Sequence, residues 1–224
     1  MKITWYGHSA VMVDDGVKIL IDPFIEGNPL SPVKASDLHP DIILVTHGHG
    51  DHLGNAIEIA KENNVSIVAI YELAEYLSSK GVNAIGMNFS GSFEFKGKTI
   101  TMVYALHSAG ISMDNFDHSG GLPCGFVIRG TRTVYHAGDT GIFGDMKLIG
   151  ELYRPEISLL PIGGFFTMGI REAALAAKML GSKIVIPIHY NTFDAIRQDP
   201  EMLKKELKGV SEVVILKPGQ TGEF

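Results

Sequence analysis

The feature that most constrains this chain is a predicted buried strand followed at once by a cluster of potential metal ligands. Residues 41–45, Asp-Ile-Ile-Leu-Val, form an apolar run that predicts a strand inside the protein. The residues that follow include His47, His49, Asp51 and His52. Neutral imidazoles and carboxylates bind zinc, manganese, iron or nickel through nitrogen and oxygen. The fold must therefore leave room for metal ions where this strand ends.

The spacing within the cluster favours two ions side by side. His47 and His49 are two residues apart, so on extended backbone their side chains point the same way and can bind one ion. Gly50 then allows the chain to turn, which lets Asp51 and His52 face a second ion. The alternative is a polar loop of solvated histidines. A single histidine would fit that alternative, but four ligand-type residues threaded with glycines do not.

Composition and charge narrow the class of protein. Of the 224 residues, 45% are hydrophobic and 20% are charged, as in ordinary globular proteins, and no linker divides the chain, so we expect one domain over residues 1–224. The net charge of −6 argues against a nucleic-acid partner, and no apolar run is long enough to span a membrane. The single cysteine, Cys124, is typical of a reducing compartment. We expect a cytoplasmic protein that acts on a small molecule, alone or as a homo-oligomer.

The hydrophobic pattern predicts an α/β protein. Strand-like segments come first in pairs and then alternate with helix-like segments, in two halves of similar outline, which favours mixed sheets covered by helices. Helices are expected at residues 53–63, 72–80, 144–152, 170–180 and 200–207. Strands are expected at residues 3–13, 17–22, 42–46, 65–71, 99–106, 124–129, 133–137, 157–161, 183–188 and 213–216.

Three further polar residues come directly after predicted strands: His107, Asp139 and His189. The carboxyl ends of strands in an open α/β sheet are where ligands gather. Each residue has a simpler interpretation, because a histidine at a strand end can be an ordinary hydrogen-bonded group and Asp139 can be a turn residue or helix cap. Two ions need more ligands than one loop supplies, so we expect all three residues to join the first cluster.

Residues 46–52, Thr-His-Gly-His-Gly-Asp-His, resemble the His-x-His-x-Asp-His signature of the metallo-β-lactamase superfamily, and the three later ligands follow in the order that this superfamily uses. Segments 6–9, 21–24, 138–141 and 163–169 resemble its UPF0173 metal-dependent hydrolase branch, which is related to the ascorbate-6-phosphate lactonases. The resemblance covers essentially the whole chain. It implies a four-layer αββα sandwich of two mixed β-sheets flanked by helices, with the site at one edge between the sheets.

The resemblance also implies a dinuclear metal site. The first ion would be held by His47, His49 and His107, the second by Asp51, His52 and His189, and both would share Asp139. Zinc is the ion that the family suggests, manganese is its strongest rival, and nickel and iron suit the same donors.

Several nearby residues have open roles. His8 is either a substrate contact or proton donor beside the ions, or a buried structural histidine. Asp22 is expected to accept a hydrogen bond from a ligand imidazole, with capping of the turn before Pro23 as the alternative, and His136 is expected to be structural. Asp51 is expected to be catalytic as well as a ligand, because it can orient the nucleophile.

The segment 163–169 carries weaker expectations. Gly163 and Gly164 either present backbone N–H groups to an anion or form a plain turn. Phe165, Phe166 and Met168 are expected to be core or pocket walls. The UPF0173 branch often has a histidine where this chain has Phe165 or Phe166, so a substrate contact made by that histidine is not implied here. No substrate-binding residue is assigned.

The chemistry expected from these residues is hydrolysis by a hydroxide that two metal ions share. A phosphoester or phosphodiester is the first substrate class, because paired cations suit in-line displacement. A lactone or other cyclic ester is the alternative, suggested by the lactonase relatives. A non-enzymatic alternative is a redox di-iron or metal-binding protein, although the flavin domain of di-iron relatives has no counterpart here. A nucleic-acid-processing enzyme fits poorly with the acidic charge.

Overall fold

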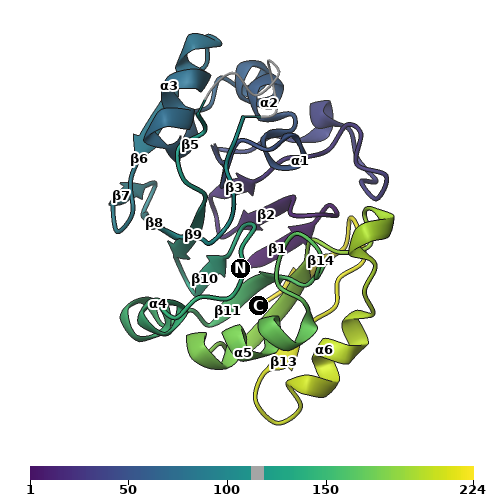
Figure 1. Ribbon diagram of the computed structural model, residues 1–224. Coiled ribbons are helices and arrows are strands. Elements are labelled where there is room, and N and C mark those ends of the chain that lie inside the picture. The colour runs from purple at the N-terminus through teal and green to yellow at the C-terminus, as the bar shows by residue number, and fades with distance from the viewer. Residues whose placement is uncertain (112–118) are drawn as a thin grey trace.

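The computed structural model describes residues 1–111 and 119–224, and it consists of two seven-stranded sheets with helices on their outer sides (Figure 1). The strand order of the first sheet is β14-β1-β2-β3-β4-β5-β6 and that of the second is β13-β12-β11-β10-β9-β8-β7. This confirms the predicted α/β class with a four-layer αββα arrangement. No helix among the described residues is long and apolar enough to cross a membrane.

The strands of the first sheet are β1 Lys2–Trp5, β2 Val11–Asp14, β3 Lys18–Ile21, β4 Ile42–Leu44, β5 Ile67–Ile70, β6 Ala84–Met87 and β14 Thr221–Glu223. Those of the second sheet are β7 Ser92–Phe95, β8 Lys98–Tyr104, β9 Cys124–Arg129, β10 Thr133–His136, β11 Ile157–Pro161, β12 Ile184–Ile188 and β13 Glu212–Val213. The helices are α1 Gly50–Leu53, α2 Ala56–Asn63, α3 Tyr71–Ser79, α4 Met146–Tyr153, α5 Ile170–Leu180 and α6 Pro200–Glu206, with 3-10 turns η1 Ala35–Asp37 and η3 Asp194–Ile196.

Both sheets follow the same pairing pattern, which gives the two halves of the chain a similar outline. In the first sheet β14, β1, β2 and β3 pair antiparallel, and β3 to β6 pair parallel. In the second sheet β7 to β10 pair antiparallel, and β10 to β13 pair parallel. The parallel strands β4 and β12 each lead into a segment that carries a site histidine, His47 after β4 and His189 after β12.

The core explains why the central strands form. Strands β5 and β11 are buried along their whole length, as expected for parallel strands covered on both faces. Helix α5 turns Ala173, Ala174 and Ala177 inward, and these small side chains allow close packing against β11. Fully burying one aliphatic side chain stabilises the fold by about 1.5–3 kcal/mol. The core thus holds the strand ends in fixed positions.

Two predicted elements are each divided in the structure. The strand expected at residues 3–13 is two strands, because Gly7 adopts a φ of +97° and the Tyr6 N–H bonds to the Ala10 carbonyl across a tight turn. The helix expected at 53–63 is divided by Gly54, whose φ is +41° and whose added Cβ would lie 2.5 Å from the Pro23 carbonyl. Helix α1 therefore begins inside the ligand cluster and carries two of its residues.

Strands β6, β7 and β14 were not predicted from the sequence. All three are only partly buried and lie at sheet edges, so their apolar pattern is weak. The remaining predicted elements are present, with ends shifted by at most a few residues.

Asp15 joins the two sheets and makes a testable contribution to stability. Its carboxylate accepts bonds from Lys98 Nζ at 2.6 Å and from the Thr131 N–H and hydroxyl at 2.7 Å each. Burial alone would raise the pKa of Asp15, but these bonds outweigh it and lower the pKa to about 2. A lowered folded-state pKa stabilises the protein above the unfolded pKa near 4, and this stabilisation is lost as the pH falls towards 2.

We expect Asp15→Asn to lower the free energy of unfolding at pH 7 by about 1–2 kcal/mol, after allowance for solvent screening. Urea unfolding of the variant and the wild type at pH 7 and at pH 3 would measure this difference in the free energy of unfolding. The difference between variant and wild type should shrink at the lower pH, and an equal difference at both would contradict the assigned role.

Candidate metal centre

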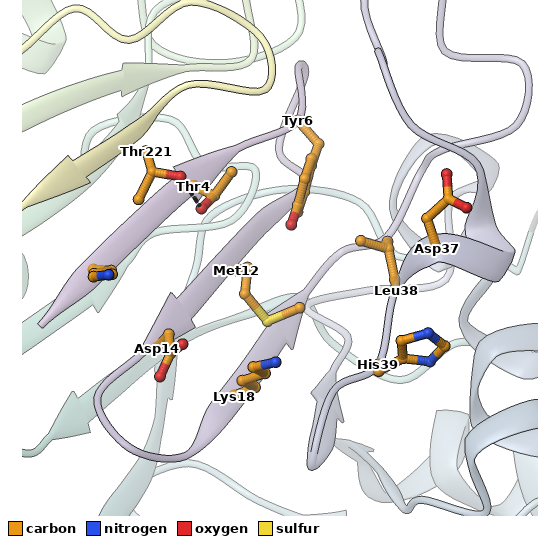
Figure 2. Close-up of a pocket in the computed structure, with 10 residues that line it drawn as sticks. Thr4, Tyr6, Met12, Asp14, Lys18, Asp37, Leu38, His39 and Thr221 are labelled. Carbon is orange, nitrogen blue, oxygen red and sulfur yellow. Dashed lines mark hydrogen bonds between the residues drawn. The ribbon is translucent and has the colours of Figure 1, made fainter.

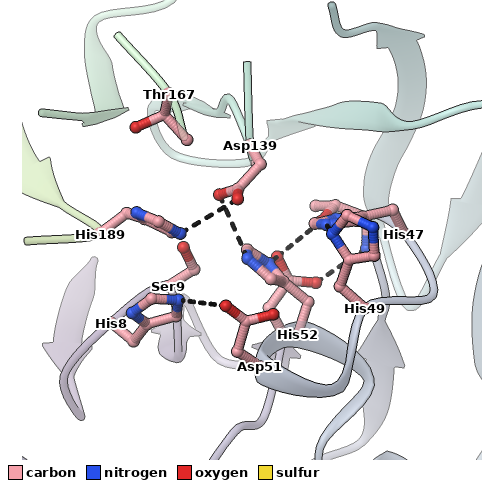
Figure 3. A network of polar contacts seen from close by, with 12 residues as sticks. His8, Ser9, His47, His49, Asp51, His52, Asp139, Thr167 and His189 are labelled. Carbon is pink, nitrogen blue, oxygen red and sulfur yellow. Dashed lines mark hydrogen bonds and ion pairs between the residues drawn. The ribbon is translucent and has the colours of Figure 1, made fainter. Parts of the chain in front are cut away.

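The residues predicted to bind metal converge at the edge where the two sheets meet (Figure 3). His47 and His49 follow β4, and Asp51 and His52 lie on α1. From the second sheet come residues that follow β8, β10 and β12, namely His107, Asp139 and His189. Together with His8, these residues form three groups. Inside each group the potential ligand atoms lie within 4.8 Å of one another. The groups are His47, His49 and His107; His47, His52 and Asp139; and His8, Asp51, His52 and His189.

Asp139 lies at the centre of the cluster. Its Oδ1 is 3.2 Å from His52 Nε2, and its Oδ2 is 3.0 Å from His189 Nε2 and 3.5 Å from His107 Nε2. The three histidines come from three separate segments of the chain, and His52, Asp139 and His189 are at most 3% exposed. A carboxylate placed in this way can contact two ions at once.

Several buried polar atoms of the cluster have no hydrogen-bond partner among the described residues. They are His52 Nε2, Asp139 Oδ1, and both ring nitrogens of His189. Buried polar atoms are nearly always satisfied, so orphaned ones need an explanation. Here Nε2 of both histidines and Oδ1 lie close together without hydrogen-bond geometry, which is the arrangement of atoms directed at shared cations. The donor set therefore fits divalent metal ions.

His47 and His49 face each other through their ring nitrogens. His47 Nε2 lies 2.9 Å from His49 Nδ1. The other ring nitrogen of His47, Nδ1, is 3.0 Å from the Thr46 hydroxyl oxygen, whose own proton is donated to Asp22. The Thr46 oxygen can thus accept from Nδ1–H, which leaves the lone pair of His47 Nε2 turned towards His49.

Asp22 is the hub of hydrogen bonds behind the ligands. Its carboxylate accepts the Thr46 N–H at 2.8 Å, the Thr46 hydroxyl at 2.7 Å and His52 Nδ1 at 2.8 Å. The last bond orients the ring of His52 so that Nε2 faces Asp139. A second carboxylate behind a ligand histidine fixes its tautomer and raises its basicity. Asp22 thus contacts the imidazole of a proposed ligand, and its predicted role behind the metal stays a prediction.

Burial and charge set the protonation of the cluster. Burial lowers the pKa of His47, His49 and His107, so these imidazoles are neutral at pH 7 and can donate lone pairs. Burial also opposes ionisation of Asp139, but His189 and His52 outweigh it and hold its pKa well below the usual range.

His52 differs from the other histidines. Burial would lower its pKa, but the carboxylates of Asp139 and Asp22 raise the pKa well above its ordinary value. In the metal-free protein His52 is therefore protonated at neutral pH. A ligand histidine must be neutral, so a cation that binds here displaces this proton.

His8 lies beside Asp51 and is completely buried. Its Nε2 is 3.1 Å from Asp51 Oδ2, and its Nδ1 is 2.9 Å from the hydroxyl of Thr192. Burial, followed by repulsion from His189, lowers the pKa of His8 to about 4. Burial raises the pKa of Asp51, but the bond from His8 more than compensates and the net shift is downward. His8 is therefore neutral and Asp51 is ionised.

Three residues of the site have left-handed backbone, which side chains other than glycine adopt rarely. The φ angles are +53° at His8, +47° at Asp22 and +53° at His189. Such conformations cost about 1–3 kcal/mol each and persist only where the surroundings enforce them. Here the His189 N–H donates to the His8 carbonyl at 2.8 Å, so two of the strained residues support each other across the sheets.

The other predicted residues have varied outcomes. His136 is structural, as expected: it is buried, with Nε2 3.1 Å from the Ser9 carbonyl and Nδ1 accepting the Gly138 N–H. Of the two alternatives for Gly163 and Gly164, the plain turn is found at Gly164, because its N–H donates to the Met168 carbonyl. Of the two positions expected for Phe165 and Phe166, the core is excluded because they are 71% and 53% exposed, and a role as pocket walls stays a prediction.

Sequence reasoning missed the roles of Thr46 and Thr192. Each hydroxyl lies within 3.0 Å of a ring nitrogen of a site histidine. Thr46 is the first residue of the 46–52 signature, so the sequence could have indicated its role. Thr192 lies 184 residues from His8, and no pattern in the neighbouring sequence marks it.

A separate hollow lies on the outer face of the first sheet (Figure 2). It has a volume of about 260 Å³, and its lining includes Tyr6, Met12, Lys18 and His39. His39 is bonded through Nδ1 to the Asn63 side chain at 2.9 Å and belongs to none of the three ligand groups. It therefore serves as a comparison residue for substitutions of the site histidines.

Comparison with known proteins gives consistent results. The profile of the β-lactamase superfamily domain matches residues 17–190. A UPF0173 metal-dependent hydrolase of Methanosarcina mazei is 55% identical over 224 residues, covering 99% of this chain and 97% of the relative. A UPF0173 metal-dependent hydrolase of Methanopyrus kandleri is 51% identical over the full length of both chains. The solved structure of a metallo hydrolase from Ignicoccus hospitalis superposes with a TM-score of 0.90 at 41% identity, covering 100% of this chain and 98% of that one.

Proposed function

Because the chain belongs to the UPF0173 metal-dependent hydrolases of the β-lactamase superfamily, we propose that its histidine and aspartate cluster holds two divalent metal ions for hydrolysis. The first ion would be held by His47, His49 and His107, and the second by Asp51, His52 and His189. Asp139 would contact both. The observation that carries this proposal is the central position of Asp139, within 3.0–3.5 Å of imidazole nitrogens from three separate segments of the chain.

The donor atoms are imidazole nitrogens and carboxylate oxygens, which accept zinc, manganese and nickel. We propose zinc as the resident metal, with manganese as its main rival. When bound, two divalent cations would supply Lewis-acid chemistry, lowering the pKa of a water in the site and polarising the bond under attack.

The chain's own residues prepare the site for this chemistry. The three neutral histidines of the first group offer lone pairs, and the ionised Asp51 and Asp139 offset part of the cationic charge. Asp22 holds His52 in place, and Thr46 holds His47. Asp51 faces solvent with 32% of its side chain exposed, so it is the ligand that can also orient an incoming water.

We propose a phosphoester or phosphodiester as the substrate class. The charge of two divalent cations exceeds that of the three nearby carboxylates, Asp22, Asp51 and Asp139. A loaded site would therefore attract the anionic oxygens of a phosphoester, and a pair of cations suits in-line displacement at phosphorus.

A lactone or other cyclic ester is the second candidate, and the aromatic surroundings favour it. The rings of Phe24 and Phe193 lie 5.8 and 5.5 Å from that of His8, edge to face, and Phe193 is 38% exposed. In the described part of the chain, the ion pairs recorded for Asp22, Asp51 and Asp139 involve histidines and no lysine or arginine. An apolar wall with no added cation suits an uncharged substrate.

Metal removal and restoration would test the proposal. We expect protein stripped with a chelator to lose its hydrolytic activity and to regain it with zinc or manganese. A chromogenic phosphodiester and several lactones, assayed with each restored metal, would separate the two substrate classes. If stripped protein kept its full rate, or if neither class were turned over with any metal, the proposed chemistry would be contradicted.

A further inference from the structure

A chain of two hydrogen bonds links the loop after β12 to a proposed metal ligand. The Thr192 hydroxyl lies 2.9 Å from His8 Nδ1, and His8 Nε2 lies 3.1 Å from Asp51 Oδ2. Thr192 is 6% exposed and His8 is not exposed at all. Figure 3 shows the His8 ring directed at the Asp51 carboxylate.

The chemistry of the three groups matches the order in which they lie. A carboxylate oxygen accepts hydrogen bonds, and His8 Nε2 faces Asp51 Oδ2, so Nε2–H is the donor in this bond. The Thr192 hydroxyl can donate to the lone pair of Nδ1, and this bond favours the tautomer in which His8 offers Nε2–H to Asp51.

The backbone around Thr192 is held firmly against that of His8. The His8 carbonyl accepts the His189 N–H at 2.8 Å and Trp5 Nε1–H at 2.9 Å. Tyr190 stacks on Trp5, with ring centroids 5.3 Å apart and planes 12° apart. Thr192 therefore has a fixed position from which to orient the His8 ring.

We propose that Thr192 and His8 are positioning residues for Asp51. His8 holds one carboxylate oxygen of Asp51, which leaves the other oxygen to face the second metal ion. This inference rests on the proposed function, because it assigns the two residues to the ion held by Asp51, His52 and His189. It gives His8 a role other than substrate contact, in keeping with its burial and with the use of both ring nitrogens.

Thr192→Val tests the inference by removing the hydroxyl while keeping the side-chain shape. Metal-free protein would be titrated with zinc alone in a calorimeter. We expect the affinity of one ion to fall about 10-fold while the other ion keeps its affinity. This is the lower end of the effect of losing a hydrogen-bond partner behind a ligand, because Thr192 acts on Asp51 through His8. Thr192→Ser should restore wild-type binding, because it returns the hydroxyl.

Thr101→Val is the matched control. Thr101 is 5% exposed, and its hydroxyl is bonded to the Ser92 hydroxyl within the second sheet, away from the cluster. The Thr101→Val protein should bind both zinc ions with the affinities of the wild type. Thermal unfolding of each metal-free variant would show that the fold is kept.

A double substitution distinguishes positioning of Asp51 from a general loss of packing. His8→Asn is suitable because asparagine tolerates the left-handed backbone at this position. In the His8→Asn protein, adding Thr192→Val should cause no further loss of zinc affinity. A further loss equal to that in the wild type would overturn the inference.

Failure of this inference differs from failure of the proposed function. If Thr192→Val binds both zinc ions as tightly as the wild type, or weakens both equally, the positioning role is wrong while the metal site stands. If the wild-type protein binds no zinc or manganese, the proposed function is wrong and the inference falls with it.

Discussion

Replacing Asp139 with asparagine is expected to abolish metal binding at both proposed positions and to lower kcat/KM by at least about 100-fold. Among the described residues, Asp139 is the one carboxylate that lies within 3.5 Å of ring nitrogens from three separate segments. Losing a residue that only supports a ligand typically costs 10–100-fold in metal affinity or activity, so losing the shared ligand should cost more. Asparagine has nearly the same shape, which limits damage to packing.

Elemental analysis and kinetics on the same preparation would measure both effects. Asp145→Asn, at an exposed aspartate at the start of α4, is the matched control and should match the wild type in metal content and rate. An Asp139→Asn protein that retained both ions at full affinity would show that Asp139 does not join them.

His49→Ala is expected to remove the ion held by the first histidine group and to eliminate turnover with it. His49 is paired with His47 through nitrogens 2.9 Å apart, and burial keeps its imidazole neutral and ready to donate. The group that contains Asp51, His52 and His189 does not include His49, so the ion proposed there should remain bound. Metal content and kcat/KM would be measured after dialysis against metal-free buffer.

His39→Ala controls for the loss of an imidazole elsewhere. His39 lies in the hollow on the outer face of the first sheet and should change neither quantity. If His49→Ala kept its full metal content and rate, the assignment of His49 as a ligand would be wrong.

The positions of the proposed ligands along the chain were predictable because they follow apolar runs. Strands β4, β8, β10 and β12 are marked by hydrophobic segments, and each is followed by a histidine or aspartate. The rule that strand ends gather at one edge then brings residues 47, 107, 139 and 189 together. The signature in residues 46–52 supplied the rest of the expected ligand set.

The supporting residues were not predictable in the same way. Thr192 contacts His8 across 184 residues of sequence, and the left-handed backbone at His8 and His189 depends on a bond between their two segments. A hydrogen bond made by a threonine, or a positive φ, cannot be predicted from neighbouring residues when it depends on a segment far away in the sequence. The same limitation applies to β14, a short edge strand formed by pairing with β1 at the opposite end of the chain.

Anomalous diffraction from crystals of the zinc-loaded protein would test the central claim most directly. The account predicts two peaks at the zinc absorption edge about 3.5–4 Å apart, on either side of Asp139. One should be surrounded by His47, His49 and His107, and the other by Asp51, His52 and His189. A single peak, or peaks away from Asp139, would contradict it.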